Sequence, residues 1–411
     1  MTDRPEGPAA VGASAAPALS LPEFVALMAL LTATVAFSID AMLPALPEIA
    51  DALAPDAPNA AQLVIVAFVL GLGAGTLFMG PLSDAFGRKP VILAGAALYC
   101  ASAALCTIAP SLETMLAARL LQGIGASAPR VAAQAMIRDL YAGRAMAKVS
   151  SFVMMTFTLV PAIAPLIGAG IIAGFGWRGV FWAFVLFSAI GMAWLWARQP
   201  ETLPPARRRA PSLSRLRAAA GEVLSHANVR RAIAIQTLLS GAFFATLTSV
   251  QPVYDVTFAR ADAFPLWFGL VSVLAGGASL LNARLVERLG MLWLLRRALA
   301  GHLALSMALM ALWLLEALPE AAAFPAFLVW QISTFALAGL TIGNLNAIAM
   351  QPLGHVAGMA ASVIQATSTV AGVALAAPIG LMFDGTPVPL LCGAVACTGT
   401  ALLLVRRLRE G

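Results

Sequence analysis

Asp40 is the residue whose type and position best suit proton exchange. It lies inside the apolar segment Phe37-Ser-Ile-Asp40-Ala-Met-Leu-Pro44, whereas nearly all of the other acidic residues lie in tails, polar gaps or the ends of apolar runs. Burial away from water favours the neutral carboxyl, and a nearby arginine favours the carboxylate. A carboxyl whose surroundings alternate between two conformations can therefore bind and release a proton. A purely structural pairing at the end of the run is the alternative.

Two arginines also lie inside an apolar run. Arg119 begins the segment Arg119-Leu-Leu-Gln122-Gly123-Ile-Gly125, and Arg130 follows further along the same run. A charge inside such a run is costly and indicates function, while the glycines allow another helix to approach. Asp40 and Arg119 are expected at similar depth, so a contact between them is allowed. Each arginine has an alternative, which is a side chain that simply extends to the membrane interface.

The segment from Gly80 to Lys89 reads Gly-Pro-Leu-Ser-Asp-Ala-Phe-Gly-Arg-Lys. Gly80 and Gly87 suit a tight turn between two helices, because glycine adopts backbone conformations that other residues avoid. Asp84 can accept hydrogen bonds from the amides at a helix N-terminus, or it can pair with Arg88. The segment therefore predicts either a latch within the fold or a plain turn with flanking positive charges.

The elements that carry these residues are apolar enough to cross a membrane. Of the 411 residues, 61% are hydrophobic and 11% are charged, whereas soluble domains are about 45–50% apolar and about 25% charged. A helix needs about 20 apolar residues to cross the ~30 Å hydrocarbon core. The sequence therefore predicts an all-α membrane protein with twelve transmembrane helices. The expected spans are 23–43, 60–80, 90–109, 112–135, 148–173, 178–197, 230–252, 265–283, 292–314, 324–347, 359–381 and 387–405.

The distribution of positive charge predicts the orientation of these spans. On the N-terminal side lie 21 of the 25 Lys and Arg residues, and the opposite gaps hold only Arg178 and Arg260. Cytoplasmic loops carry such an excess, so both termini are expected in the cytoplasm. The longest gap separates six spans from six, which predicts two pseudo-symmetric six-helix bundles. The expected parts are a disordered cytoplasmic tail (1–22), an N-terminal bundle (23–198), a cytoplasmic linker (199–229), a C-terminal bundle (230–405) and a cytoplasmic tail (406–411).

A weak internal repeat supports the division into two halves. The segment after the second span is echoed after the eighth by Ala283-Arg-Leu-Val-Glu287-Arg-Leu-Gly290. The copy keeps an acid and a glycine but has Met291 at the place of Arg88. Any latch is therefore expected to be asymmetric.

Other classes of function lack support in the sequence. No catalytic triad, phosphate-binding loop or cluster of metal ligands is visible, so no enzyme activity, metal or cofactor is expected. The basic residues fall in short gaps without a continuous stripe, which argues against nucleic acid. The four cysteines lie in apolar runs and are expected to pack as small apolar side chains. The expected partners are small molecules, protons and membrane lipid, and the chain is expected to act as a monomer.

Several of these motifs together resemble a known family. The segment Ser38-Ile-Asp40-Ala-Met-Leu-Pro44, the turn from Gly80 to Lys89, Arg-Asp139-Leu-Tyr141 and the Ala164-Pro165 stretch are similar to the Bcr/CflA group of the major facilitator superfamily. These are bicyclomycin- and chloramphenicol-type drug:proton antiporters of bacterial inner membranes. The resemblance covers residues 25–200 well and rests mainly on the span pattern beyond them. It implies the major facilitator fold and a location in the inner membrane.

The resemblance also implies roles for single residues. Asp84 and Arg88 would stabilise an outward-facing state, and Gly80 and Gly87 would belong to the same gating loop. The segment that begins at Arg119 corresponds to one that is linked to proton transfer in the family.

The fifth span holds a further motif of the same family. Its segment Pro161-Ala-Ile-Ala-Pro165-Leu-Ile-Gly168 can bend and pack closely, because proline removes a helical hydrogen bond and glycine admits a neighbour. It resembles the Gly- and Pro-rich helix that is characteristic of antiporters. A generic kinked helix is the alternative.

By the same resemblance, the first, fourth, seventh and tenth spans line a central cavity. Aromatic and amide side chains there would suit lipophilic, modestly polar drugs, although helix packing can explain each of them singly. The candidates are Phe37, Gln122, Arg130, Gln236, Phe243, Gln331 and Phe335.

The expected function is proton-coupled drug export by alternating access of two halves. A proton that binds Asp40 from outside would weaken any pairing with Arg119 and promote release of the drug. An exporter of a specific metabolite or amino acid, and a membrane receptor without transport activity, are the alternatives.

Overall fold

The computed structural model describes residues 19–409, apart from the side chains of 156–158 and 213. Its first half contains α1 (Leu21–Asp40), η1 (Leu43–Ala45), α2 (Leu46–Leu53), η2 (Pro58–Gln62), α3 (Leu63–Phe86), α4 (Arg88–Thr107), α5 (Leu112–Leu140) and α6 (Gly143–Arg198). The linker contains η3 (Pro205–Arg207) and α7 (Leu213–Ser225). The second half contains α8 (Ala227–Pro252), η4 (Val253–Thr257), α9 (Phe264–Leu289), α10 (Met291–Leu314), α11 (Glu320–Met350), η5 (Gln351–Val356), α12 (Ala357–Leu381) and α13 (Val388–Val405).

These helices supply twelve membrane-crossing segments among the described residues. Nine stretches have the length and hydropathy of membrane spans. One of them is α6, which Gly176 divides into two legs because its φ of 65° is not helical. Another contains both α11 and α12, joined by the turn η5. The twelfth segment is α5. Its arginines lower its hydropathy, but it packs between α3, α4 and α1.

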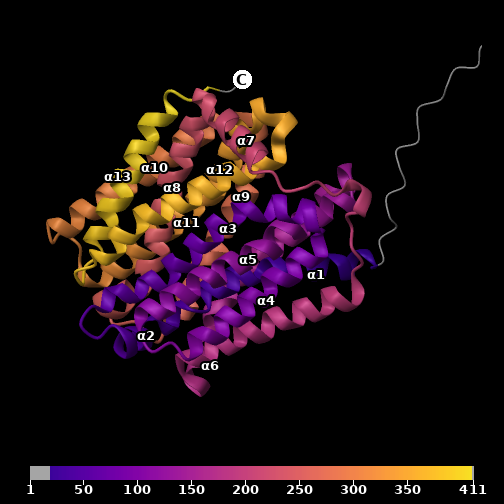
Figure 1. Ribbon diagram of the computed structural model, residues 1–411. Coiled ribbons are helices and arrows are strands. Elements are labelled where there is room, and N and C mark those ends of the chain that lie inside the picture. The colour runs from indigo at the N-terminus through magenta and orange to yellow at the C-terminus, as the bar shows by residue number, and fades with distance from the viewer. Residues whose placement is uncertain (1–18, 410–411) are drawn as a thin grey trace, which may run out of the picture.

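The segments form two bundles that lie side by side (Figure 1). In the first half α3, α4 and α6 pack around α1 and α5, and in the second half α9, α10, α12 and α13 pack around α8 and α11. The halves meet along two helix pairs, α3 with α12 and α6 with α9. In the second pair Gly269 of α9 faces the backbone of Ala162, and a Cβ at Gly269 would lie 2.6 Å from that carbonyl oxygen.

The two ends of the molecule differ in charge. The basic end carries the turn between α3 and α4, the linker and the start of α1. The acidic end carries α2, η2 and η4, and its only basic residues are Arg178 and Arg260 among the described chain. Nine acidic residues lie at this end: Glu48, Asp51, Asp56, Glu113, Asp255, Asp262, Glu316, Glu320 and Asp384.

Polar contacts between the halves are concentrated at the acidic end. The side chain of Asn59 donates to the carbonyl oxygens of Leu381 (3.2 Å) and Phe383 (2.7 Å). Gln62 donates to the Gly380 carbonyl (3.1 Å) and accepts from the Ser249 hydroxyl (3.1 Å). These four are the hydrogen bonds that join described residues of the two halves, and all four lie at the acidic end. This end is therefore closed in the structure.

The expected boundaries and the observed ones differ by a few residues. The helix α1 begins at Leu21, so residues 19–22, expected in the tail, include its first two residues, and Leu19 is already buried. The rest of that expected tail, residues 1–18, lies outside the described residues, as do 410–411. The linker contains the amphipathic helix α7, which packs on α8 and α12.

The internal repeat is visible in the backbone. Gly87 separates α3 from α4 with φ 105° and ψ 157°, and Gly290 separates α9 from α10 with φ 80° and ψ 155°. Positive φ is strained for residues with a Cβ, which explains glycine at both positions. The asymmetry also appears, because Arg88 forms ion pairs and Met291 has no charge to offer.

Candidate proton-coupling site and signature turn

Asp40 is the last residue of α1, and it is buried although the helix ends there. Its exposed fraction is 5%, because η1 and α6 cover this end of α1. It is the only acidic residue among the described ones with so little exposure. No hydrogen bond or ion pair joins its carboxyl group to another described residue. An ionised carboxylate here would be an unpaired buried charge, which is strongly unfavourable.

Arg119 is fully buried on α5 and is held by backbone and amide oxygens. Its guanidinium donates to the carbonyls of Val64 (3.2 Å) and Ser38 (3.1 Å), and to the side chain of Gln122 (2.8 Å). It also lies over the ring of Phe68, at 4.4 Å from the centroid. These groups take the place of a carboxylate partner.

The contact between Asp40 and Arg119 that the sequence allowed is not formed in this structure. The Ser38 carbonyl, two residues before Asp40, receives the guanidinium instead. Ser38 is itself fixed from the other side, since its hydroxyl lies 2.5 Å from the hydroxyl of Tyr99 on α4. Tyr99 was not among the predicted site residues, although a tyrosine inside an apolar run signals a buried hydroxyl that needs a partner.

The predicted antiporter helix lies directly against the end of α1. Pro161, Pro165 and Gly168 are all in the first leg of α6, which stays helical through both prolines. A Cβ at Gly168 would lie well under 3.0 Å from the carbonyl oxygen of Ala41. Because Ala41 follows Asp40, the structure brings the antiporter helix and the candidate proton site together.

The predicted cavity residues of the first half fall into different surroundings. Phe37 packs against Phe184 and Phe187 of the second leg of α6, with ring centroids 5.4 and 4.9 Å apart, so it belongs to the packing of its own bundle. Gln122 is fully buried, and its side-chain oxygen accepts a hydrogen bond from Arg119. Its Nε2 has no hydrogen-bond partner among the described residues. Arg130 is half-buried and forms no ion pair with a described residue.

In the second half the structure brings two of the predicted aromatic residues together. Phe243 of α8 and Phe335 of α11 are both half-buried, and their ring centroids are 5.1 Å apart. Gln331 is fully buried and accepts from the hydroxyl of Tyr254 (2.8 Å). Gln236 is also buried and donates to Asn346 (3.3 Å). These contacts are spread along α8 and α11, and only Phe335 and Gln331 lie one helical turn apart on α11.

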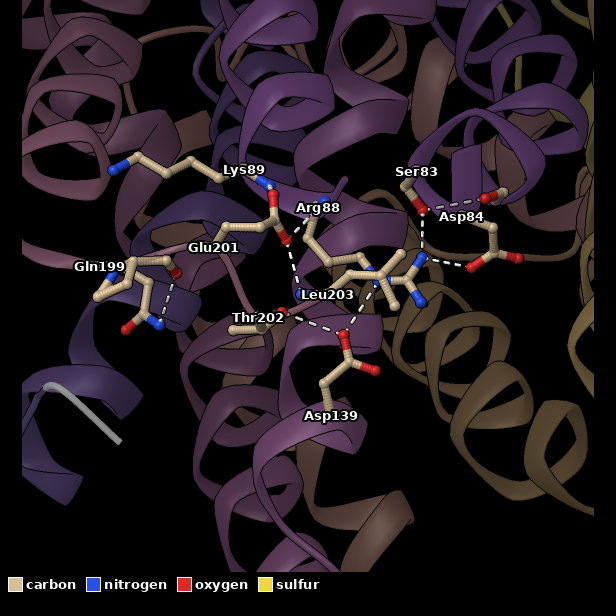
Figure 2. Close-up of polar contacts among 11 residues, drawn as sticks. Ser83, Asp84, Arg88, Lys89, Asp139, Gln199, Glu201, Thr202 and Leu203 are labelled. Carbon is tan, nitrogen blue, oxygen red and sulfur yellow. Dashed lines mark hydrogen bonds and ion pairs between the residues drawn. The ribbon is translucent and has the colours of Figure 1, made fainter. Parts of the chain in front are cut away.

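The turn from Gly80 to Lys89, here called the signature turn, forms an ion-pair cluster at the basic end (Figure 2). The guanidinium of Arg88 contacts Asp84 at 2.5 Å and Asp139 at 3.0 Å, and it also donates to the hydroxyl of Ser83 (2.8 Å). Asp84 thus pairs with Arg88, which decides between the two partners that the sequence left open for it. Gly80 lies on α3 before this cluster, facing Ser362 of α12.

Glu201, from the linker, occupies the N-terminus of α4 (Figure 2). Its carboxylate accepts from the backbone amides of Arg88 (3.0 Å) and Lys89 (3.0 Å), and from that of Leu203 (2.8 Å). Gly87 makes room for it, since a Cβ there would lie 2.5 Å from a Glu201 oxygen. A carboxylate at a helix N-terminus satisfies amides that lack a helical partner. Glu201 could not be predicted as a partner of this turn, because 113 positions separate it from Arg88.

Replacing Glu201 by alanine is expected to loosen the linker from the turn. Loss of a capping side chain costs about 1 kcal/mol, so the melting temperature of the purified protein should fall by a few degrees. Glu201→Gln, which keeps one acceptor oxygen, should fall between alanine and the native chain. Equal melting temperatures for all three proteins, measured by tryptophan fluorescence, would show that the carboxylate contributes nothing.

Comparisons with known proteins place this arrangement among transporters. A family model described as the Major Facilitator Superfamily matches residues 28–377. The "Bicyclomycin resistance protein homolog" of Haemophilus influenzae is 29% identical over 92% of this chain and 94% of its own length. The "Chloramphenicol resistance protein" of Pseudomonas aeruginosa is 38% identical, over 40% of this chain and 39% of its own length.

Solved structures share the fold at low sequence identity. A D-xylose-proton symporter superposes with a TM-score of 0.75 at 16% identity, over 95% of this chain and 99% of its own. The human organic anion transporter MFSD10 superposes with a TM-score of 0.68 at 19% identity, over 95% and 98% of the two chains. At these identities the likeness concerns the fold alone.

Proposed function

This chain belongs to the Major Facilitator Superfamily, and from that premise we propose that it is a proton-coupled exporter of lipophilic drugs. As a member it is a multi-pass membrane transporter of small molecules rather than an enzyme. The resistance relatives named above support drugs as its substrates. The remaining question is what drives the export.

The observation that carries the proton coupling is the state of Asp40. It is buried, it has no polar partner among the described residues, and it lies against the helix that contains Gly168. An acid in such a place is stable when it is protonated and becomes costly when it is ionised. We infer that Asp40 holds a proton in the conformation described here.

The orientation follows from the charges of the two ends. We propose that the basic end faces the cytoplasm of a bacterial cell and that the acidic end faces outward across the inner membrane. The hydrogen bonds of Asn59 and Gln62 between the halves at the acidic end support our assignment of an inward-facing state. The linker and both termini are then cytoplasmic.

The proposed cycle alternates the access of Asp40. In the outward-facing state the contacts of Asn59 and Gln62 are broken, and Asp40 takes up a proton from outside while the drug leaves. The protonated acid allows the end of α1 to be buried again, which favours the inward-facing state. Release of that proton to the cytoplasm and binding of new drug complete the cycle. Arg119, anchored to the Ser38 carbonyl, holds α1 against α5 beside the acid.

The residues of α8 and α11 support a lipophilic substrate. The pair Phe243 and Phe335 offers aromatic surface, and the Nε2 of Gln331 has no hydrogen-bond partner among the described residues. Rings together with a few free amides suit apolar molecules that carry one or two polar groups.

The proposal is tested by accumulation of a fluorescent drug in bacteria that lack their main efflux pumps. Cells that express this chain should accumulate less drug than cells with an empty vector, and an uncoupler that collapses the proton gradient should remove the difference. A difference that survives the uncoupler would contradict proton coupling. Equal accumulation in both strains over a panel of lipophilic drugs would contradict drug export and favour a specific metabolite.

A further inference from the structure

A cavity of about 450 Å³ lies between the two halves at the acidic end. One wall comes from α2 and η2, and the opposite wall comes from α8, η4 and the segment after α12. This volume is within the usual range for drug-sized ligands. Much of the lining is apolar and includes Leu46, Pro47, Pro252 and Phe383.

Three carboxylates share this cavity without a basic partner. Asp51 comes from the first half, and Asp255 and Asp384 come from the second. No basic residue lines the cavity among the described residues. The hydroxyl and amide of Thr386 donate to one oxygen of Asp384 and hold the pKa of its carboxyl below the ordinary value, so that it stays ionised.

The two arginines of the acidic end do not neutralise these acids. Arg178 lies over the ring of Trp177, at 4.1 Å, and donates to the Thr107 carbonyl. Arg260 lies over the ring of Phe324, at 4.5 Å. Neither lines the cavity. Since nine acids surround them at this end, the field in the cavity attracts cations.

A buried amide gives a second, independent indication of a ligand. Gln251 lines the cavity, has an exposed fraction of 4% and makes no hydrogen bond with a described residue. A molecule in the cavity would supply the partner that the protein does not.

We propose that this cavity is a binding site for a monovalent organic cation with an apolar body. The carboxylates would attract the positive charge of the cation, its apolar part would pack against the wall that includes Phe383, and Gln251 would hydrogen-bond a polar group. Because Asp51 and Asp255 belong to different halves, a bound cation ties the halves together next to Asn59. Its occupancy therefore stabilises the closed acidic end and inhibits opening. The site is separate from Asp40, and only its position on the outer face rests on the proposed function.

The test measures binding of tetraphenylphosphonium to the purified full chain by isothermal titration calorimetry. The variant Asp51→Asn/Asp255→Asn/Asp384→Asn is expected to bind at least tenfold more weakly than the native chain, and each single substitution a few-fold more weakly. The control is Asp56→Asn/Asp262→Asn/Glu316→Gln, which removes the same charge at the same end outside the cavity lining. It should bind like the native chain.

Several outcomes would overturn the site. Equal affinity of the native chain and the cavity variant would do so, as would an equal loss in the control. Equal binding of triphenylphosphine oxide, a neutral molecule of similar shape, would show that charge plays no part. Binding is measured without a proton gradient, so a chain that exports nothing can still confirm the site. Conversely, if the native chain exports drug with a proton gradient and the cavity variant binds the cation as well as the native chain does, the proposed function stands and only the cation site is ruled out.

Discussion

Replacing Asp40 by asparagine is expected to abolish proton-driven drug export. The amide has nearly the same shape as the protonated acid, so the buried end of α1 should stay packed as it is now. The amide cannot release a proton, however, so the step of the cycle in which the proton leaves to the cytoplasm is lost. Drug accumulation in cells with Asp40→Asn should match that of cells with an empty vector, at equal protein levels in the membrane.

A second measurement separates loss of coupling from loss of folding. Exchange of labelled for unlabelled drug across vesicles, without a proton gradient, needs only movement of the two halves and should persist in Asp40→Asn. Asp56→Asn, which neutralises an exposed acid at the same end outside the cavity lining, should export like the native chain. Uphill export by Asp40→Asn would contradict the assignment of Asp40 as the coupling group.

The sequence predicted the elements well because hydrocarbon imposes a simple rule on them. Every span must be a helix that satisfies its own backbone, so long apolar runs identify the helices almost one by one. The α5 helix shows where that rule weakens, since Arg119 and Arg130 reduce its hydropathy. Its place was still predictable, because the residues around both arginines form one continuous run.

The partners of the charged residues were much less predictable. The burial of Asp40 could be predicted from its apolar neighbours. Whether Arg119 donates to the Ser38 carbonyl or to the Asp40 carboxyl, however, depends on how α1 and α5 are rotated against each other. Glu201 reaches Arg88 and Lys89 only because the chain returns to the same end after α6. Periodicity fixes which face of a helix is apolar, and it carries no information about such returns.

Phe37 illustrates the same limit for the substrate cavity. Its span was expected to line a central cavity, and an aromatic residue there suggested a contact with drugs. The structure turns the ring toward Phe184 and Phe187 of the same bundle. In a chain that is apolar on nearly every face, hydropathy does not distinguish a side chain that faces a cavity from one that faces a neighbouring helix.

Gly168→Ala is expected to reduce export about tenfold while the protein still folds. The added methyl group would overlap the carbonyl oxygen of Ala41 and would also lie within 3.1 Å of its Cα. These are backbone atoms, so no side chain can rotate away, and the first leg of α6 must move off the end of α1. Such overpacking costs about 1–3 kcal/mol, and 1.4 kcal/mol corresponds to about a tenfold change. Because the displaced backbone is next to Asp40, the added methyl group destabilises the conformation in which the protonated acid is buried.

Gly170 provides a matched control on the same helix leg. A Cβ there would meet nothing within 4 Å, so Gly170→Ala should export like the native chain. The comparison isolates the contact with Ala41, since both substitutions add one methyl group to α6 and both favour helix over glycine. If the two variants export equally, close packing of α6 on α1 is not needed for transport. A loss confined to Gly168→Ala would link the antiporter helix to the acid through a single carbonyl group.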